Sequence, residues 1–278
     1  MMHLLFTADQ NYAFHILPVL QSVRTVHPNT PFHIHLIGDD IARETIQKIC
    51  FFCQHKKMSF SSYSVEEHVF KEAPINKHYS KAMYYRMLAA DILPKTVTKV
   101  LYLDPDVLVI NSLKSLWEID MEGNLFVAAS HTGEESLLGS INKIRLDTSS
   151  VYYNTGILLM DLRQIRKEFN ADVLFSFIDT TGHKLLLPDQ DVFNALYGNR
   201  TKQVPDEIWN YDPRKYSQYL LKSAGAYDAY WVIQNTSILH YCGKEKPWHP
   251  RYRYRFGSLY RHYEHMAELE LTEQEPYL

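Results

Sequence analysis

Residues 100–110 read VLYLDPDVLVI, a run of valine and leucine interrupted by two aspartates one residue apart. A short apolar run of this kind is typical of a buried strand. The strand is expected to end at Leu103, so that Asp104 and Asp106 directly follow it. Because ligands in open α/β sheets bind beyond the carboxyl ends of the strands, these carboxylates are expected at a binding site.

The sequence before this strand predicts the beginning of a parallel sheet. HLLFTA at residues 3–8 reads as a strand, DQNY as a loop, residues 14–27 as a helix and FHIHLIG at residues 32–38 as a second strand. Pro18 lies within the helical pattern and predicts a bend or a boundary there. Together these elements indicate the α/β class.

The rest of the chain continues to alternate between helical and extended patterns. Helices are expected from about residue 41, over 80–93, after 161 and from about 189, and strands near 58–65, 125–129 and 156–160. The polar interval 131–150 is expected to form a substrate loop or lid. We predict one α/β domain over residues 1–249 and a C-terminal helical extension over residues 250–278.

The composition is that of a globular protein able to bury a large core, with 278 residues of which 46% are hydrophobic. A formal net charge of −3 argues against a broad basic field and hence against a nucleic-acid partner. No apolar run approaches the roughly 20 residues that cross a bilayer, and the N-terminus lacks the basic and long apolar regions of a signal peptide. We therefore expect a cytoplasmic protein.

The cysteines do not form a disulfide scaffold, because the chain has only three. Cys50 and Cys53 form a C-x-x-C pair, which could be a redox motif or half a zinc site. No second cysteine pair accompanies them, and the surrounding residues have helical periodicity. The interpretation as helix cysteines is therefore favoured.

A distant segment, HYCGKEKPW beginning at His240, complements the two aspartates. Carboxylate oxygens suit Mg²⁺ or Mn²⁺, and a third ligand from His240 shifts the preference toward Mn²⁺. Gly243 and Lys246 then suit a phosphate group. The hypothesis is a metal-diphosphate site. The alternatives are a surface turn at D-P-D and a core histidine at a strand end.

The N-terminal TADQNY, residues 7–12, follows the first expected strand. Asp9 and Asn11 could hydrogen-bond a heterocycle and its ribose, while Tyr12 could stack on the ring. An ordinary turn between strand and helix is the alternative interpretation of the same residues.

Taken together, these motifs resemble those of family 8 glycosyltransferases, the group of bacterial lipopolysaccharide galactosyl- and glucosyltransferases and glycogenin. The matching segments, in the family's order within residues 4–249, are TADQNY, YYRM, VLYLDPDVLV followed by SLWEID, YYNTGILLMDL, LPDQDVFNAL and HYCGKEKPWH. The resemblance implies a GT-A fold, which is a Rossmann-like, mostly parallel mixed sheet flanked by helices. It also implies a retaining hexosyltransferase with Mn²⁺ and a UDP-sugar donor, acting in cell-envelope polysaccharide synthesis.

The resemblance also implies roles for individual residues. Asp104, Asp106 and His240 would bind the metal that bridges the donor diphosphate. The donor is expected to be UDP-galactose or UDP-glucose, and the acceptor a saccharide, glycolipid or glycoprotein. The nucleotide-binding residues would be Thr7, Asp9, Asn11, Tyr12, His78, Gly243 and Lys246, and the catalytic residues around the transferred sugar would be Arg86, Asn154, Asp189 and Gln190.

Two positions bear on mechanism and specificity. Gln190 matches the family position discussed as a nucleophile, but a neutral amide is a poor one. We therefore favour front-face attack, with Gln190 and Asp189 stabilising an oxocarbenium-like centre; Asp189 could alternatively be a helix N-cap. Family galactosyltransferases place an aspartate where this chain has Ser130 and His131, which leaves galactose and glucose both open.

Three other functions fit parts of the sequence. A phosphohydrolase could use Asp104 as nucleophile and Asp106 as acid/base, but this leaves the TADQNY and HYCGKEKPW segments unexplained. The second is a non-catalytic protein that binds a nucleotide-sugar. The third is a self-glycosylating protein.

The C-terminal RYRYRFGSLYRHY segment could contact the inner face of a membrane as a peripheral surface, because arginine and aromatic residues favour the interface. The alternative is a helix packed by its tyrosines with solvated arginines.

Overall fold

The computed structural model describes residues 1–64, 85–131, 148, 151–168, 171–181 and 187–272. Within them the main element is a seven-stranded sheet in the order β3-β2-β1-β4-β7-β6-β8. The strands are β1 Met2–Ala8, β2 Phe32–Gly38, β3 Ser59–Ser64, β4 Lys99–Leu103, β6 Phe126–Ala129, β7 Ile157–Asp161 and β8 Thr201–Val204.

The sheet is mixed, with one strand running against its neighbours. β1 is parallel to β2 and β4, and β6 is parallel to β8, whereas β7 is antiparallel to both β4 and β6. The antiparallel pairing places Ile157, at the start of β7, opposite Leu103 at the end of β4. Residues just before β7 therefore lie at the same edge of the sheet as the aspartates after β4.

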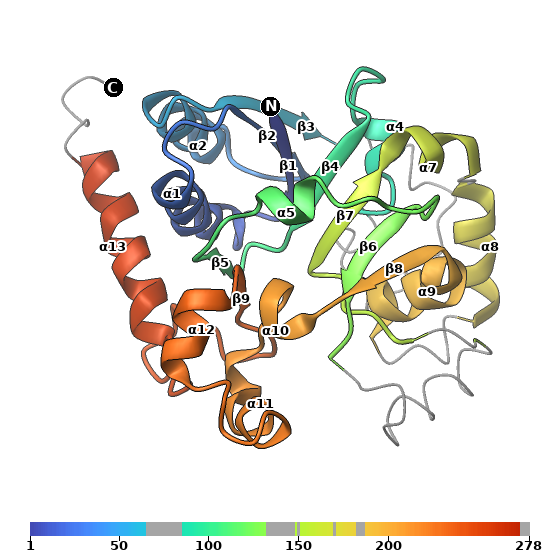
Figure 1. The fold of residues 1–278 in the computed structure, drawn as a ribbon. Helices are drawn as coiled ribbons and strands as arrows, with labels where there is room; N and C mark the ends of the chain where they lie inside the picture. The colour runs from blue at the N-terminus through green and yellow to red at the C-terminus, as the bar shows by residue number, and fades with distance from the viewer. Residues whose placement is uncertain (65–84, 132–147, 149–150, 169–170, 182–186, 273–278) are drawn as a thin grey trace.

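Helices cover both faces of this sheet (Figure 1). α1, α2 and α13 lie on one side, and α4, α7, α8 and α9 lie on the other. The helices longer than one turn are α1 Ile16–Val26, α2 Arg43–His55, α7 Leu162–Glu168, α8 Ala171–Thr181, α9 Pro188–Tyr197, α11 Tyr216–Lys222, α12 Ala229–Asn235 and α13 Gly257–Thr272. The short helices are η1 Ala13–His15, α4 Ala89–Ile92, α5 Lys114–Trp117, η4 Gly198–Arg200, α10 Asp206–Trp209 and η5 Pro213–Lys215.

The alternation of side chains along β1 explains the two cores. Leu4 and Phe6 are buried with the residues of α1 and α2, whereas Leu5 is buried with α4, α7 and α9 on the opposite face. Full burial of such a side chain stabilises the fold by about 1.5–3 kcal/mol. Strands buried on both faces need continuous apolar sequence, which explains why β1 and β4 lack polar alternation.

A second, two-stranded sheet carries part of the site. β5 Val107–Val109 pairs antiparallel with β9 Ile238–His240, and Val107 lies opposite His240. This pairing brings a residue from the end of the chain next to the segment that follows β4. It accounts for the proximity of two sequence motifs that are far apart along the chain.

The expected helix over residues 80–93 is shorter in the part that the structure describes. Residues 80–84 lie outside the described part, residue 85 is helical, residues 86–88 form a turn, and α4 spans Ala89–Ile92. Arg86 is buried in this turn and donates to the carbonyl of Thr155 at 2.7 Å. Tertiary contacts thus override the local helical pattern. By contrast, Pro18 lies in the first turn of α1, as a helix boundary requires.

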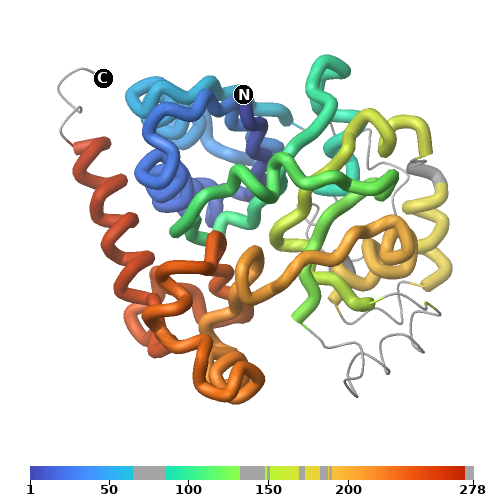
Figure 2. Tube along the Cα trace, viewed as in Figure 1, coloured from blue at the N-terminus to red at the C-terminus, as the bar shows by residue number. Residues whose placement is uncertain are grey.

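The C-terminal extension forms α13, which packs alongside α1 (Figure 2). Tyr260 of α13 is fully buried, whereas Arg261 on the same helix is exposed. Among the described residues, no helix combines the length and the apolar character that crossing a bilayer requires. Cys50 and Cys53 both lie in α2, where Cys53 is buried, as the helix interpretation predicts.

Candidate active site

Asp104, Asp106 and His240 converge between the two sheets. The Nε2 atom of His240 lies 3.4 Å from Oδ1 of Asp106 and 3.8 Å from Oδ2 of Asp104. Asp106 and His240 are buried, while Asp104 is partly exposed. The structure thus brings together all three residues that were predicted to bind a metal. The two aspartates lie where the backbone passes from β4 to β5, and His240 lies at the end of β9.

A chain of amides orients the imidazole of His240. Its Nδ1 lies 2.8 Å from Oδ1 of Asn210, whose Nδ2 donates to Oδ1 of Asn154 at 2.9 Å. The same Asn154 oxygen accepts the backbone N–H of Gly156 at 3.0 Å. Asn210 Oδ1 is therefore the acceptor, so Nδ1 of His240 carries a proton and Nε2 is the nitrogen directed toward the carboxylates.

The electrostatics of the three residues favour a cation between them. Burial raises the pKa of Asp106, but the charges of His240 and Lys246 outweigh it and hold that pKa well below its ordinary value. Burial likewise lowers the pKa of His240, but Cys242 and Asp106 raise it well above its ordinary value. The carboxylates therefore attract positive charge, which a divalent ion would supply in place of the proton.

The space around these ligands also fits a bound ion. A Cβ atom on Gly156 would lie 2.7 Å from Oδ2 of Asp104 and would clash with the ring of His240. A glycine thus leaves room that any other residue would fill. Two carboxylates and one imidazole form a donor set that suits Mn²⁺, and Mg²⁺ less well.

Lys246 and Arg86 surround the carboxylates with positive charge. The ammonium of Lys246 pairs with Asp106, and the guanidinium of Arg86 lies 3.3 Å from Oδ1 of Asp104. Burial alone lowers the pKa of Lys246, but Asp106 raises it above its ordinary value, so the ammonium stays charged. The site can therefore neutralise an anionic ligand from two sides.

One cavity, of about 200 Å³, opens on the side of β1. Asp9 folds back there, and its Oδ1 accepts the backbone N–H groups of Asn11 and Tyr12 at 2.9 and 3.0 Å. This is the ordinary turn that was the alternative for TADQNY, and it also presents the partly exposed ring of Tyr12. The lining residues are Thr7, Ala8, Asp9, Tyr12, Arg86, Tyr102, Asp104, Pro105, Asp106 and Lys246.

A second cavity, of about 410 Å³, opens on the side of α9 and shares Asp104, Asp106 and Lys246 with the first. Within it, Nδ2 of Asn154 donates to Oε1 of Gln190 at 3.2 Å. The lining residues are Asp104, Asp106, His131, Tyr152, Asn154, Leu187, Gln190, Arg214, His240, Cys242, Gly243 and Lys246.

Asp189 is not the N-cap of α9. The helix begins at Pro188, and Leu187 is its N-cap, so Asp189 is the second helical residue. Proline is favoured at the first helical position because its missing N–H would have no partner there. The side chain of Asp191 instead accepts the N–H of Leu187 at 3.0 Å.

Three residues of the site were not among those predicted from the sequence. Tyr102 donates to Asp104, and its ring lies 4.7 Å from the guanidinium carbon of Arg86. Asn210 orients His240, and Arg214 lines the larger cavity. Tyr102 could have been found, because alternation along β4 places it on the face opposite Leu101 and Leu103.

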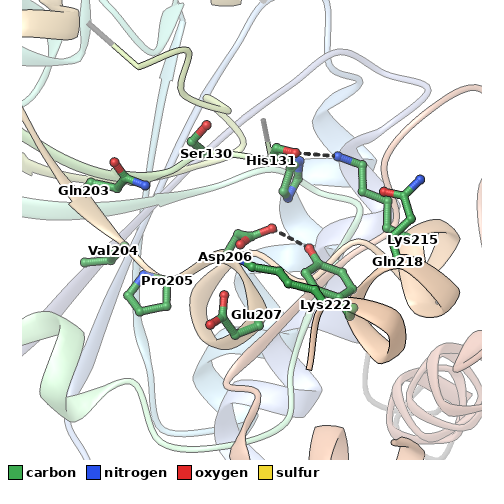
Figure 3. Close-up of a pocket in the computed structure, with 11 residues that line it drawn as sticks. Ser130, His131, Gln203, Val204, Pro205, Asp206, Glu207, Lys215, Gln218 and Lys222 are labelled. Atoms are coloured by element: carbon green, nitrogen blue, oxygen red, sulfur yellow. Dashed lines mark hydrogen bonds between the residues drawn. The ribbon is translucent and has the colours of Figure 1, made fainter. Parts of the chain in front are cut away.

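His131 lines both the larger site cavity and a third cavity of about 570 Å³, and Figure 3 shows the lining of the third cavity. Burial and the charge of Lys215 lower the pKa of His131 to about 4, so the ring is neutral at pH 7. Nε2 of His131 donates to the backbone carbonyl of Asn210 at 2.5 Å. The ammonium of Lys215 donates to the backbone carbonyl of His131 at 3.0 Å. The neighbouring Ser130 donates to the carbonyl of Tyr152 at 2.7 Å.

Two further predicted residues are Gly243, which the structure describes, and His78, which it does not. Gly243 has a positive φ of 90° and faces Arg214, with which any Cβ would clash. His78 lies outside the described residues, as does most of the polar interval 131–150.

The fold is similar to that of solved glycosyltransferases. The galactosyltransferase LgtC, solved with donor and acceptor sugar analogs, superposes with a TM-score of 0.80 at 23% identity, over 95% of this chain and 96% of that one. Glycosyltransferase GlyE of Streptococcus pneumoniae gives a TM-score of 0.71 at 22% identity, over 99% of this chain and 63% of that one. The expected GT-A fold, an α/β mixed sheet with a helical C-terminus, is confirmed.

The sequence also has curated relatives. General stress protein A of Bacillus subtilis is 25% identical, over 94% of this chain and 92% of its own length. A lipopolysaccharide 1,2-glucosyltransferase of Escherichia coli is 23% identical over 91% and 75%, and a lipopolysaccharide 1,3-galactosyltransferase of Salmonella typhimurium is 24% identical over 87% and 71%. The sequence model of glycosyl transferase family 8 matches residues 3–251, so the chain belongs to that family.

Proposed function

We propose that this family 8 glycosyltransferase moves galactose or glucose from a UDP-sugar to a saccharide, glycolipid or glycoprotein acceptor, with Mn²⁺ and with retention at the anomeric carbon. One observation carries the proposal. Asp104, Asp106 and His240 converge at the junction of two cavities, one beside Tyr12 and the other beside Gln190. A nucleotide in the first and a sugar in the second would place the diphosphate over these ligands.

The residues around the diphosphate would carry the electrophilic half of the reaction. When bound, Mn²⁺ would neutralise the diphosphate and stabilise the negative charge that develops on departing UDP. Lys246 is held by Asp106 at the junction of the cavities, so its ammonium is positioned for a phosphate oxygen. Charge that appears mainly in the transition state makes this contact stronger there than in the ground state.

The nucleoside would lie against Tyr12, whose ring is 38% exposed. Trp248 supports this ring edge-on, with a centroid separation of 5.8 Å, and itself stacks on His15 at 3.6 Å. A tyrosine held at its edge keeps a face free for a flat heterocycle. Thr7 lines the same cavity, and its hydroxyl lies 3.1 Å from the Tyr102 hydroxyl.

The sugar would be held by Asn154 and Gln190, with Asp189 one residue away on α9. The amide of Gln190 is neutral and bonded to Asn154, so it suits stabilisation of an oxocarbenium-like centre better than nucleophilic attack. We therefore favour front-face attack by the acceptor. Trapping of a covalent glycosyl-enzyme on Gln190 or on Asp189 would refute that mechanism.

The acceptor is proposed to extend into the cavity beyond His131. That cavity presents amides, carboxylates and ammonium groups from β8, α10 and α11, as Figure 3 shows. Side chains of this kind pair with sugar hydroxyls, which both donate and accept hydrogen bonds. If the acceptor is a glycolipid, the exposed arginines of residues 251–255 would provide a peripheral contact with anionic headgroups.

The proposal is tested by UDP release from a panel of UDP-sugars, with Mn²⁺ or with EDTA. We expect slow hydrolysis of UDP-galactose or UDP-glucose that depends on Mn²⁺ and is lost in Asp106→Ala. Binding of UDP-sugar without UDP release, in the presence of candidate acceptors as well, would favour a non-catalytic binding protein. Phosphate release from simple esters would favour a phosphohydrolase.

A further inference from the structure

Three histidines gather on one face of the main sheet, away from the site described above. His3 lies on β1, and His33 and His35 lie on the adjacent strand β2. The parallel register places His3 opposite His33, and His35 follows two residues later on the same face. We call this group the histidine cluster.

The cluster lies near the opposite end of the sheet from the metal ligands. His3 is the second residue of β1, whereas Asp9 directly follows the end of that strand. At about 3.3 Å per residue, the six steps from His3 to Asp9 separate these two residues by roughly 20 Å. A ligand bound by the cluster would therefore not contact the donor nucleotide.

The ring nitrogens are close enough to share one ion. One nitrogen from each histidine lies within 4.8 Å of the other two. Nδ1 of His3 is 2.9 Å from Nε2 of His35, and the rings of His33 and His35 stack with centroids 4.2 Å apart. The strand register, the hydrogen bond between His3 and His35 and the ring stacking thus hold the three side chains together.

Hydroxyl groups on β3 occupy the outward nitrogens of two rings. The hydroxyl of Tyr63 lies 3.1 Å from Nδ1 of His35, and that of Ser61 lies 2.9 Å from Nε2 of His33. The second nitrogen of His35, Nε2, shares the hydrogen bond with Nδ1 of His3, and a bound ion would replace the proton of that bond. Partners on the second nitrogen orient histidine ligands in metal sites in the same way.

Burial favours the neutral form of the rings, which is the form that binds a metal. Burial, followed by the proximity of the other two histidines, lowers the pKa of His35 to about 3. Burial also lowers the pKa of His3 and of His33. The group contains only imidazoles, and such a donor set suits Zn²⁺, Co²⁺, Ni²⁺ or Cu²⁺, whereas Mg²⁺ and Mn²⁺ prefer carboxylate oxygens.

We infer that His3, His33 and His35 form a second metal site that binds Zn²⁺ or a similar late first-row ion through three imidazole nitrogens. His35 is buried, while His3 and His33 are partly exposed, which leaves an entry path and an open fourth position. Small rotations of the rings out of their stack would point the three lone pairs at one ion. The site is chemically distinct from the carboxylate-rich one.

Co²⁺ is a suitable probe, because a four-coordinate Co²⁺ ion absorbs visible light far more strongly than a six-coordinate one. The titration uses the full chain carrying Asp104→Asn, which weakens the carboxylate site. We expect one equivalent of Co²⁺ to give intense visible bands, and one equivalent of Zn²⁺ to displace it and to raise the melting temperature.

His33→Asn is the informative variant, since His33 is partly exposed and its removal leaves the core intact. Its affinity for Co²⁺ should fall by more than about 100-fold, because losing a ligand exceeds the roughly 10–100-fold effect of losing an outer partner. His265→Asn, on the exposed surface of α13, is the matched control and should bind Co²⁺ normally.

Two results would overturn the inference. One is an unaltered Co²⁺ spectrum and stoichiometry in His33→Asn. The other is the absence of intense bands in the parent protein. If His33→Asn melts at a much lower temperature before metal is added, His3→Asn replaces it, with the same expected loss of Co²⁺ binding.

Discussion

Asn210 accepts a hydrogen bond from Nδ1 of His240 at 2.8 Å, which fixes the tautomer that presents Nε2 to the two aspartates. Asn210 is fully buried and is itself held by Asn154. The orientation of a proposed metal ligand is therefore set by a residue 30 positions away on a different element. The metal affinity of the site should depend on this amide.

Asn210→Asp should change Mn²⁺ binding without removing a ligand. An added carboxylate beside Nδ1 would favour the charged imidazole and change the amide chain to Asn154. We expect affinity for Mn²⁺ to fall by about 10–100-fold, the usual effect of altering a partner of a histidine ligand. The measurement is Mn²⁺ titration followed by electron paramagnetic resonance. Asn235→Asp, on the exposed surface, should have no effect.

Gly156→Ala should inactivate the protein by steric conflict. The new Cβ would meet the ring of His240 and lie 2.7 Å from Asp104. Overpacking of this kind costs about 1–3 kcal/mol in the free energy of unfolding, and it also displaces two of the three expected ligands. UDP release and urea unfolding are measured together. Gly225→Ala is the control, because Gly225 has a positive φ but no neighbour within 4 Å, so it should lose stability and keep activity.

Lys246→Met should lower both the rate of UDP release and the thermal stability of the metal-free protein. The change leaves the buried carboxylate of Asp106 without its ammonium partner and removes a charge from the diphosphate side of the site. We expect kcat for UDP release to fall by about 100-fold or more, in line with the loss of one preorganised electrostatic contact. The melting temperature should also fall and should recover on addition of Mn²⁺. Lys244→Met, two residues away and exposed, should change neither value.

Stability should fall as the pH decreases below about 6.5, and His27 should contribute to this loss. The backbone N–H of Leu113 donates to Nε2 of His27 at 3.0 Å, so the folded protein needs the neutral ring. Burial, and then the charge of Arg24, lower the pKa of His27. Between that lowered pKa and 6.5, the unfolded state binds more protons than the folded state, so acidification favours unfolding.

The test is urea unfolding at pH 7.5 and at pH 5 with His27→Gln. Glutamine can accept the same N–H without titrating, so the variant should lose less stability on acidification than the parent. His262→Gln, which is exposed, should retain the full pH dependence. An identical pH dependence in the parent and in His27→Gln would contradict the prediction.

Gln218→Ala should separate acceptor binding from donor binding. Gln218 is exposed on α11 and lines the cavity beyond His131 (Figure 3). Loss of a hydrogen bond to a sugar hydroxyl should raise KM for the acceptor by about threefold to tenfold, corresponding to about 0.5–1.5 kcal/mol. Hydrolysis of the donor alone should be unchanged. Gln234→Ala, exposed on α12, is the matched control, and an equal effect of both variants would exclude the cavity as an acceptor site.

The sequence by itself determined the α/β class and the order of the first strands and helices. The VLYLD run predicted β4 with Asp104 following its end, and the short apolar runs at residues 3–8 and 32–38 predicted β1 and β2. These are local properties, because the period of apolar residues and the positions of proline and glycine follow from backbone geometry. The pairing of the aspartates with His240 was also predicted, although it depended on the family resemblance as well as on the residue types.

Only the tertiary structure decided which distant side chains touch. The register of β5 against β9 places His240 beside Asp106, and the antiparallel β7 brings Asn154 to the end of β4. The partnership of Asn210 with His240 and the approach of His3 to His33 have no signature in a single segment. They arise because strands pair by burying their apolar faces together, and the resulting register then fixes every polar neighbour that local sequence leaves undetermined.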